Sequence, residues 1–299
     1  MDKRYKVVVM VGAGVVGGAT GMVLRRMGHD VRFVDISGER VNQLREQGYP
    51  ASLVSEMDLS TADVIFVAVP TPTQNGSVQL TYLASAVTSI GHNLKDRIRA
   101  RQAKDYPVVA IRSTIPVWTV RDLVIPTLER TSGGVVGTHF GVGVNPEFLR
   151  ESHAESDFAH AQLILIGADD DKTREVLASV YKEFHAEIFV VPTHVAEITK
   201  YVHNLYNALR TSFFNELRAA FAATGLELDD VQTSFSLANK TILSLGEEHG
   251  TRPLGPFGGS CLPKDLKAII AICHAMDLPI PLLEAVWYEN ELEAERSKA

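Results

Sequence analysis

One stretch of the sequence decides the fold: Lys6-Val7-Val8-Val9-Met10-Val11-Gly12-Ala13-Gly14-Val15-Val16-Gly17. Its first half is a short, valine-rich apolar run, which is typical of a buried strand. The glycines that follow fit a tight turn into a helix whose positive N-terminal end can hold a pyrophosphate. Asp35 ends the next predicted strand, where an acid accepts hydrogen bonds from an adenosine ribose and repels a 2'-phosphate. The pattern predicts a site for NAD rather than NADP, formed by Gly12, Gly14, Val15, Val16, Gly17 and Asp35. The alternative is a glycine-rich turn that binds nothing.

Further apolar runs alternate with helical patterns along the first two thirds of the chain. We expect strands at residues 6–11, 30–35, 63–69, 108–112, 141–144, 163–167 and 187–191. Most of these runs are continuously apolar, as in parallel strands that are covered on both faces. The pattern predicts an α/β domain with a doubly wound, Rossmann-type parallel sheet over residues 1–192.

From residue 195 to about residue 224, no Pro or Gly interrupts the chain, and apolar residues recur at helical spacing. We interpret this segment as one long helix that opens a smaller, all-helical domain over residues 193–299. Its apolar side chains include Phe213, Phe214 and Phe221, too many for one solvated side, so we expect a homodimer. Residues 246–264 are rich in Gly and Pro and are predicted to form a loop.

Composition and charge exclude several classes of function. The 299 residues carry a formal net charge of -7, and this acidic balance disfavours binding to nucleic acid. No apolar stretch is long enough to span a membrane. The sequence has two cysteines, Cys261 and Cys273, too few for a disulfide framework, so we expect a cytoplasmic protein. The sequence does not indicate a metal site.

One of these cysteines lies in an unusual segment. Residues 257–265 read FGGSCLPKD, with Cys261 after paired glycines and Asp265 four residues later. A lone cysteine is usually a small buried apolar side chain, as we expect for Cys273 on a helix. The glycines give close access to the backbone around Cys261, and the neighbours are polar. The context therefore favours a thiol that takes part in chemistry.

Polar residues form a stripe on the long predicted helix. Lys200 and Asn204 lie one turn apart and face the same way, and Asn207 and Thr211 extend the stripe. A solvated surface is the simpler interpretation. A paired set of donors for a substrate oxygen is the functional one.

The segment NPEFLRE, residues 145–151, follows a predicted strand end, where ligands of α/β proteins bind. Asn145 fits a helix N-cap and Pro146 fits the first helical position. In such a helix Glu147 and Glu151 would share a face. Acidic residues in a first turn can also serve only the helix dipole.

Together, these segments resemble the UDP-glucose/GDP-mannose dehydrogenase family. The resemblance runs through most of the chain and rests on the glycine turn, Val69-Pro70-Thr71-Pro72-Thr73 with Gly76, Arg112-Ser113-Thr114-Ile115-Pro116, NPEFLRE, Lys200-Tyr201 with Asn204, and GGSCLPKD. It implies the oxidation of a sugar primary alcohol to a carboxylate in two steps, with two NAD. In this chemistry Cys261 adds to the intermediate aldehyde, and the resulting thioester is hydrolysed.

The resemblance also implies roles for individual residues. Lys200 and Asn204 would donate to the developing oxyanion, Asp265 and Thr114 would hold a water that carries a proton, and Glu151 would act in thioester hydrolysis with Glu147 as orienter or base. The NAD site would be lined further by Pro70, Thr71, Thr73, Ser113 and Thr114. The substrate would be contacted by Phe148, Leu149, Arg150, Phe257, Gly258 and Gly259.

The sequence departs from the family in its length. Family members carry a third, nucleotide-binding domain, whereas this sequence stops at Ala299. We therefore expect a weaker dependence on the nucleoside diphosphate, with a sugar nucleotide or a smaller sugar derivative as substrate. Two alternatives stay open. The first is a two-electron β-hydroxyacid dehydrogenase, which would also use Lys200 and Asn204 but has no use for Cys261. The second is a relative that binds NAD without catalysing a reaction.

Overall fold

The computed structural model describes residues 6–100, 106–243, 256–258 and 262–297. The chain forms two compact units, Met1–His203 and Asn204–Ala299. The division lies inside the long helix α7, Thr193–Ala222.

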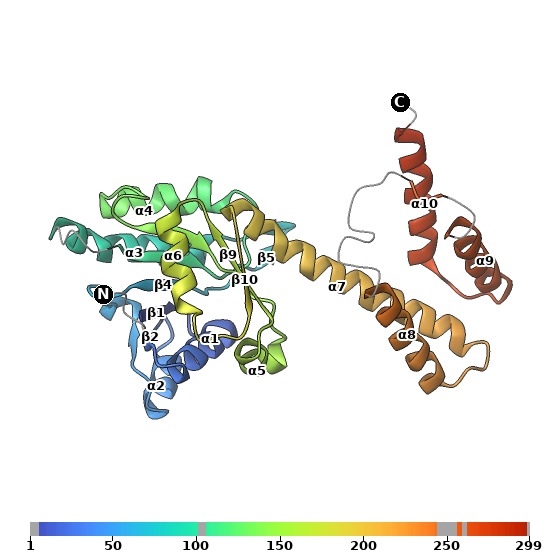
Figure 1. Cartoon of the computed structure of the whole chain (residues 1–299), viewed down its shortest axis with the longest axis horizontal. Helices are drawn as coiled ribbons and strands as arrows, with labels where there is room; N and C mark the ends of the chain where they lie inside the picture. The colour runs from blue at the N-terminus through green and yellow to red at the C-terminus, as the bar shows by residue number, and fades with distance from the viewer. Residues whose placement is uncertain (1–5, 101–105, 244–255, 259–261, 298–299) are drawn as a thin grey trace. The chain divides into compact units, whose positions relative to one another are not determined.

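The first unit is built on an eight-stranded sheet with helices on both faces (Figure 1). The strand order is β10-β9-β8-β7-β4-β1-β2-β3, in which β1 and β4 are neighbours. The strands are β1 Val7–Val11, β2 Asp30–Asp35, β3 Ala51–Leu53, β4 Val64–Val67, β7 Val108–Ile111, β8 Gly141–Val144, β9 Leu163–Ala168 and β10 Glu187–Val191. A separate hairpin pairs β5 Thr73–Gln74 with β6 Ser77–Val78. The order of the six strands from β3 to β8 is that of a Rossmann fold, whose ligand crevice opens between β1 and β4. The predicted doubly wound α/β fold is confirmed.

Alternate residues of each strand enter one of two buried clusters, which explains why the strands read as continuous apolar runs. Val9 and Ile65 pack on one face with α3, Thr81–Arg99, and α4, Ile125–Ser132. Met10 and Phe66 pack on the other face with α1, Val15–Arg26, and α6, Asp171–Val180. The remaining helical segments of this unit are α2 Gly38–Glu46, α5 Ala154–Ala159, the short turns η1 Val54–Glu56 and η3 Glu151–His153, and the π-helical turn η2 Val120–Val124.

One strand pair departs from the predicted parallel arrangement. β8 and β9 are antiparallel, with Val144 opposite Gly167, while β10 is parallel to β9. The connection between them contains only η3 and the six-residue helix α5, and no helix long enough to cross the sheet. Residues 145–162 therefore stay at the carboxyl edge of β8, the edge at which open α/β sheets generally bind their ligands.

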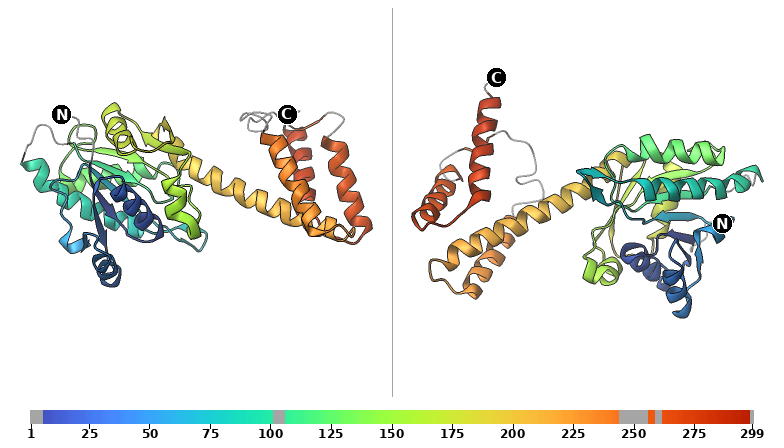
Figure 2. Two further views of the ribbon diagram at one scale, coloured as in Figure 1. Left: turned by 60° about the horizontal axis from the view of Figure 1, so that its bottom comes forward. Right: turned by 180° about the vertical axis from the view of Figure 1, so that it is seen from behind.

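The second unit is helical. It contains the C-terminal part of α7, together with α8 Leu228–Leu243, α9 Leu262–Ala275 and α10 Pro281–Arg296. α8 packs against α7 through Phe214 and Phe235, whose ring centroids are 4.7 Å apart (Figure 2). The predicted long helix over 195–224 is present, two residues earlier at each end. The predicted loop over 246–264 is too long at its C-terminal end, because α9 begins at Leu262 with Pro263 in its first turn. Among the described helices, none has the length and apolar content required to cross a membrane.

Candidate active site

The glycine turn joins β1 to α1, and sterics fix two of its three glycines. Gly12 has a φ of 90°, and a Cβ there would lie 2.5 Å from the Ala68 carbonyl oxygen. A Cβ on Gly17 would lie 1.9 Å from the Gly12 carbonyl oxygen. Gly14 differs, since a Cβ there would meet nothing within 4 Å. The open space over Gly14, at the N-terminus of α1, fits the close approach of a pyrophosphate.

Asp35, at the end of β2, is tied to this turn. Its Oδ2 accepts a hydrogen bond from the Ala13 N–H at 2.7 Å, and its Oδ1 accepts one from the Ser37 N–H at 2.9 Å. Each carboxylate oxygen can accept a second hydrogen bond. Asp35 is thus positioned beside the turn with acceptor capacity left for ribose hydroxyls.

Arg40 is a residue of this site that was not among the predicted ones. Its Nε donates to the Ala13 carbonyl oxygen at 2.7 Å, so the guanidinium lies against the glycine turn. The signal for it was its place in the first turn of α2, five residues after Asp35. The structure therefore adds a cation to the predicted dinucleotide site.

Two loops at the carboxyl ends of the neighbouring strands β4 and β7 are joined by hydrogen bonds. The Thr71 hydroxyl donates to the Thr114 carbonyl oxygen at 2.6 Å, and the Ser113 hydroxyl donates to the Val69 carbonyl oxygen at 2.6 Å. Pro70 is exposed between these contacts, and Thr73 lies further along in the exposed hairpin strand β5. Four of the five predicted loop residues thus come together at the crevice edge.

Lys200 and Glu147 form a nearly buried ion pair. The distance from Lys200 Nζ to Glu147 Oε1 is 2.8 Å, and the two side chains are 7% and 13% exposed. Glu147 Oε2 also accepts a hydrogen bond from the Leu149 N–H at 2.6 Å. Phe148 packs beside the pair, with Lys200 Nζ 5.7 Å from its ring centroid and the His203 ring 4.8 Å away. This ion pair therefore fixes the NPEFL segment to α7. Its cation is Lys200, which is predicted to donate to the substrate oxygen.

The predicted helix at residues 146–151 is absent. Asn145 does not cap a helix but enters a buried network: its Oδ1 accepts from Arg112 and Tyr181, and its Nδ2 donates to the Leu165 carbonyl oxygen at 2.8 Å. Arg112 is 3% exposed and lies 4.8 Å from the centroid of the Phe158 ring. Burial lowers the pKa of Arg112 and raises the pKa of Tyr181 to about 12. These long-range bonds to Asn145 outweigh the local preference for a helix.

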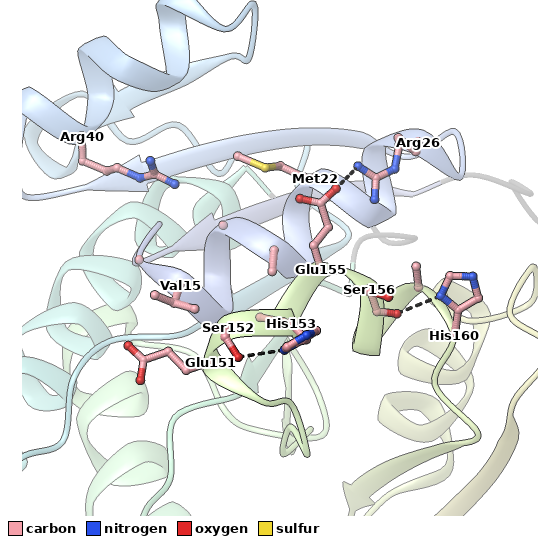
Figure 3. A pocket seen from close by; sticks show the side chains of 15 residues that line it. Val15, Met22, Arg26, Arg40, Glu151, Ser152, His153, Glu155, Ser156 and His160 are labelled. Carbon is pink, nitrogen blue, oxygen red and sulfur yellow. Dashed lines mark hydrogen bonds and ion pairs between the residues drawn. The ribbon is translucent and has the colours of Figure 1, made fainter.

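Glu147 and Glu151 consequently do not share a helix face. Glu151 is exposed in η3, where it lines a cavity of about 620 Å³ together with Gly14, Val15 and Arg40 (Figure 3). Figure 3 shows the Glu151 side chain on the same side of the cavity as Val15. The structure thus brings Glu151 next to the dinucleotide turn and Glu147 next to Lys200.

Arg150, between these two acids, is held by α5. Its backbone N–H, Nε and Nη2 all donate to the Asp157 carboxylate, at distances of 2.9, 2.9 and 2.6 Å. These bonds hold the pKa of Asp157 well below its usual range. Leu149 packs with the cluster on the α1 face of the sheet. Arg150 and Leu149 therefore fix the segment that carries the two acids.

The second unit contains the remaining predicted residues. Asp265 lies in the first turn of α9 and forms an ion pair with Lys264. The Phe257 N–H donates to Asn290 Oδ1 at 2.7 Å, and Asn290 Nδ2 donates back to the Phe257 carbonyl oxygen at 3.1 Å. Phe257 and Asp265 both line an apolar cavity of about 510 Å³ in this unit. Asn204 is exposed on α7 and Gly258 is exposed beside Phe257.

The predicted residues Cys261 and Gly259 lie outside the described residues. Cys273 is 1% exposed on α9, as expected for a cysteine that packs, and burial raises the pKa of its thiol. Among the residues that the structure describes, no group of three or more His, Cys, Asp or Glu side chains could hold a metal ion.

Comparisons with known proteins follow the same division of the chain. The NAD binding domain of the UDP-glucose/GDP-mannose dehydrogenase family matches residues 48–185, and the central domain of this family matches residues 194–292. A GDP-mannose 6-dehydrogenase from Pseudomonas putida is 32% identical, over 96% of this chain and 68% of the relative. A UDP-glucose 6-dehydrogenase from Haloferax volcanii is also 32% identical, over 96% of this chain and 70% of the relative.

Solved structures agree with these matches. A ternary complex of GDP-mannose dehydrogenase from Pseudomonas aeruginosa is similar with a TM-score of 0.86 and 31% identity, over 96% of this chain and 69% of that one. A UDP-glucose dehydrogenase from Pyrobaculum islandicum is similar with a TM-score of 0.66 and 29% identity, over 96% of this chain and 68% of that one. The chain therefore belongs to the UDP-glucose/GDP-mannose dehydrogenase family and is an NAD-dependent dehydrogenase.

Proposed function

We propose that this enzyme oxidises the primary alcohol of a sugar nucleotide, or of a smaller sugar derivative, to a carboxylate. The observation that carries the proposal is the Lys200–Glu147 pair, buried just beyond the carboxyl end of β8 with a separation of 2.8 Å. A fixed cation at such a place can stabilise negative charge that develops on a substrate oxygen. The names of the relatives, which refer to GDP-mannose and UDP-glucose, support this class of substrate.

The first unit would hold NAD. The open space over Gly14 and the N-terminus of α1 suit the pyrophosphate, while Asp35 suits the adenosine ribose. Arg40 adds positive charge beside the turn. We assign Val15, Val16, Gly12 and Gly17 to the turn, and Pro70, Thr71, Thr73, Ser113 and Thr114 to the loops that line the rest of the site. NAD supplies the hydride acceptor for both oxidations.

We assign the stabilisation of the substrate oxygen to Lys200 and Asn204. Lys200 keeps two N–H donors besides the one that faces Glu147, and Asn204, one helical turn later, carries an amide NH₂. A single donor of this kind is worth about 3 kcal/mol in other enzymes. Glu147 holds Lys200 in place, since it is itself anchored by the Leu149 N–H.

We assign the covalent step to Cys261. The alcohol carbon first loses a hydride and its hydroxyl a proton, and the thiol then adds to the aldehyde: the C–S bond forms and the thiol proton passes to the carbonyl oxygen. Loss of a second hydride and of that hydroxyl proton leaves a thioester. Water displaces the sulfur, giving the carboxylate and the free thiol.

The proton transfers are assigned to the remaining polar residues. Asp265 and Thr114 would hold a water that accepts the alcohol proton, and Glu151 would act in the hydrolysis of the thioester. Phe148, Leu149, Arg150, Phe257, Gly258 and Gly259 are assigned to the substrate site. The Arg150 guanidinium is already bound by Asp157, so we assign to Arg150 the task of holding its segment of the substrate site in shape.

We further propose that the enzyme is a homodimer of the cytoplasm. Four apolar residues on one face of α7 are exposed by 43% to 66%, namely Ile198, Val202, Leu205 and Leu209. An apolar stripe of this length is unusual on a monomer. The presence of two cysteines in the whole sequence favours a reducing compartment.

The proposal is tested by assaying the purified chain with NAD against nucleoside-diphosphate sugars, sugar phosphates and β-hydroxyacids. We expect NADH formation with at least one sugar alcohol and a carboxylate as the product. Activity confined to β-hydroxyacids would instead identify the two-electron reaction. NAD binding without turnover of any compound in the panel would favour a non-catalytic relative.

A further inference from the structure

Glu197, on α7, is a buried acid that the proposed chemistry does not use. It is 2% exposed. Its Oε2 accepts a hydrogen bond from the Trp118 N–H at 2.7 Å, and its Oε1 accepts one from the Val120 N–H at 2.8 Å. Both oxygens therefore bind the backbone of the loop that follows β7. Burial raises the pKa of Glu197, so the residue is kept there at a cost in solvation.

This loop is held in an uncommon conformation at the point of contact. Trp118 has a φ of 71°, which is rare for a residue with a large side chain. Its ring stacks on His194 with centroids 4.6 Å apart, and the Arg121 guanidinium lies 4.4 Å from it on η2. Such a conformation persists only where the surroundings over-determine it, and it is often found at functional sites.

The loop has a second anchor at its other end. Ser113 and Thr114 are bonded to the loop after β4, through the Val69 carbonyl oxygen and the Thr71 hydroxyl. Ile115 between the anchors is 1% exposed. Residues 113–120 are therefore fixed at one end to the crevice edge and at the other end to Glu197.

Glu197 lies three residues before Lys200, and thus on the same face of α7 within one turn. Resting on the proposed function, we infer that Glu197 is a positioning residue: it ties the loop that carries Thr114, on the NAD side, to the turn of α7 that carries Lys200, on the substrate side. A displacement of about 1 Å between such groups can reduce the rate by about 100-fold.

Other charged groups face Glu197 from neighbouring elements. His194, on its own helix, and Arg121, on η2, act to stabilise its negative charge, whereas Asp169, after β9, opposes it. Glu197 binds two backbone N–H groups, and each of them needs a hydrogen-bond acceptor. The two carboxylate oxygens of Glu197 supply these acceptors. The isosteric Glu197→Gln variant would place an amide NH₂ against one of these N–H groups.

The matched control is Asp169→Asn, also a carboxylate-to-amide change that affects α7. Asp169 accepts hydrogen bonds from the Thr193 N–H at 3.0 Å and from the Thr193 hydroxyl at 2.6 Å, and so anchors the start of α7. A hydroxyl can turn to accept from the new amide. This variant changes the hydrogen bonding and charge at the start of α7 and leaves both hydrogen bonds to Glu197 in place.

The experiment measures kcat, the Kd of NAD and the melting temperature of the wild-type, Glu197→Gln and Asp169→Asn enzymes, with the best sugar nucleotide as substrate. We expect Glu197→Gln to lower kcat about tenfold or more. The Kd of NAD should change by less than about threefold, because the glycine turn and Asp35 are untouched. Asp169→Asn should keep the wild-type kcat. Equal kcat values for Glu197→Gln and the wild type would overturn the inference.

A spectroscopic readout separates this inference from the proposed function. The sequence has two tryptophans, so Trp287→Phe leaves Trp118 as the only reporter. In that background, Glu197→Gln should increase the quenching of Trp118 by acrylamide and Asp169→Asn should not. If no sugar derivative is oxidised, the proposed function fails, while unchanged quenching in Glu197→Gln overturns the inference by itself. Should Glu197→Gln not fold, Glu197→Asp, which keeps the charge but is too short to bind both N–H groups, carries the same test.

Discussion

The two units bury their apolar residues to very different extents. In the first unit, buried clusters cover both faces of the sheet, and side chains such as Phe66 and Ile90 are 0% exposed. In the described part of the second unit, the cluster that joins α7, α9 and the start of α10 has four buried members, namely Ala220, Cys273, Ile280 and Leu283. Large apolar side chains there stay exposed, among them Leu205 at 66% and Leu237 at 60%.

The two units therefore differ in the source of their stability and in the chemistry that we assign to them. A sheet covered on both faces stabilises the first unit from within, and its edge presents the predicted NAD site. The helices of the second unit leave apolar surface that a second copy of the chain can cover. The predicted sulfur chemistry belongs to the second unit and the predicted hydride acceptor to the first, so substitutions can separate them.

The largest effect is expected from Cys261→Ala. Without the thiol, no thioester should form, and carboxylate production should fall by about 10³-fold or more. The Kd of NAD should stay unchanged, because we assign the cofactor to the first unit. The measurement is product analysis together with NAD titration. Cys273→Ala is the matched control: this thiol is 1% exposed, so the variant loses some stability but keeps its activity. Normal carboxylate production by Cys261→Ala would exclude the covalent route.

The next effect is expected from Lys200→Met, which removes the buried cation and leaves Glu147 without its ion-pair partner. The first hydride transfer, followed by stopped-flow detection of NADH, should slow by about 10²- to 10³-fold. Lys240→Met, on the exposed face of α8, is the control and should behave as the wild type. A first hydride transfer of ordinary rate in Lys200→Met would show that Lys200 has only a structural role.

Cofactor preference tests the first unit alone. The Asp35 carboxylate lies against the glycine turn, so a 2'-phosphate would meet like charge, and NADP should bind about 30-fold more weakly than NAD or worse. Asp35→Ser should narrow this ratio, because Arg40 then remains as a nearby cation. Competitive binding of NAD and NADP to the wild type and to Asp35→Ser measures this ratio of affinities. NADP binding as tight as NAD in the wild type would contradict the assignment of Asp35.

One substitution in each unit should reveal the different roles of their apolar residues. Ile90→Ala, in the first unit, should lower the free energy of unfolding by about 2–5 kcal/mol at any protein concentration. Leu205→Glu, on the exposed stripe of α7, should instead halve the mass found by light scattering, and make stability independent of concentration. A wild-type chain that is monomeric at micromolar concentration would refute the expected dimer.

The smallest effect concerns acid stability of the first unit. His29 is 4% exposed; its Nδ1 accepts from the Lys6 N–H and its Nε2 donates to the Val180 carbonyl oxygen, an arrangement that suits the neutral ring. Burial lowers its pKa, so the unfolded chain binds the proton more tightly. Stability should therefore fall as the pH drops below the unfolded value of about 6.5, and level off below the depressed folded pKa. Urea titrations between pH 5 and 8 should show a weaker slope in His29→Asn; an identical slope would exclude His29 as the cause.

The sequence predicted the elements better than their pairing. Three predicted strands, at 30–35, 141–144 and 187–191, match the structure residue for residue. The antiparallel contact of β8 and β9 could not be foreseen, because a short apolar run has the same pattern in either direction. β3, Ala51–Leu53, was missed because it has three residues and none of them is fully buried.

The polar contacts of the site depended on distant residues. The helix predicted after Asn145 is wrong because that side chain bonds Arg112 and Tyr181, which lie 33 and 36 residues away in the sequence. Glu197 carries no local signal, since an acid on a helix usually faces solvent. Lys200, in contrast, was predicted from spacing and resemblance, but its pairing with Glu147 was not. Residue types and spacing indicate the chemistry of the site, whereas tertiary contacts determine the hydrogen-bond and ion-pair partners of each side chain.

The proposed function requires that one enzyme performs both oxidations, from alcohol to carboxylate. The most direct measurement is the amount of NADH formed per molecule of limiting sugar substrate, followed to completion at 340 nm with excess NAD. We expect two molecules of NADH and one molecule of carboxylate for each molecule of substrate. One NADH per substrate, with the aldehyde or ketone as the end product, would contradict it.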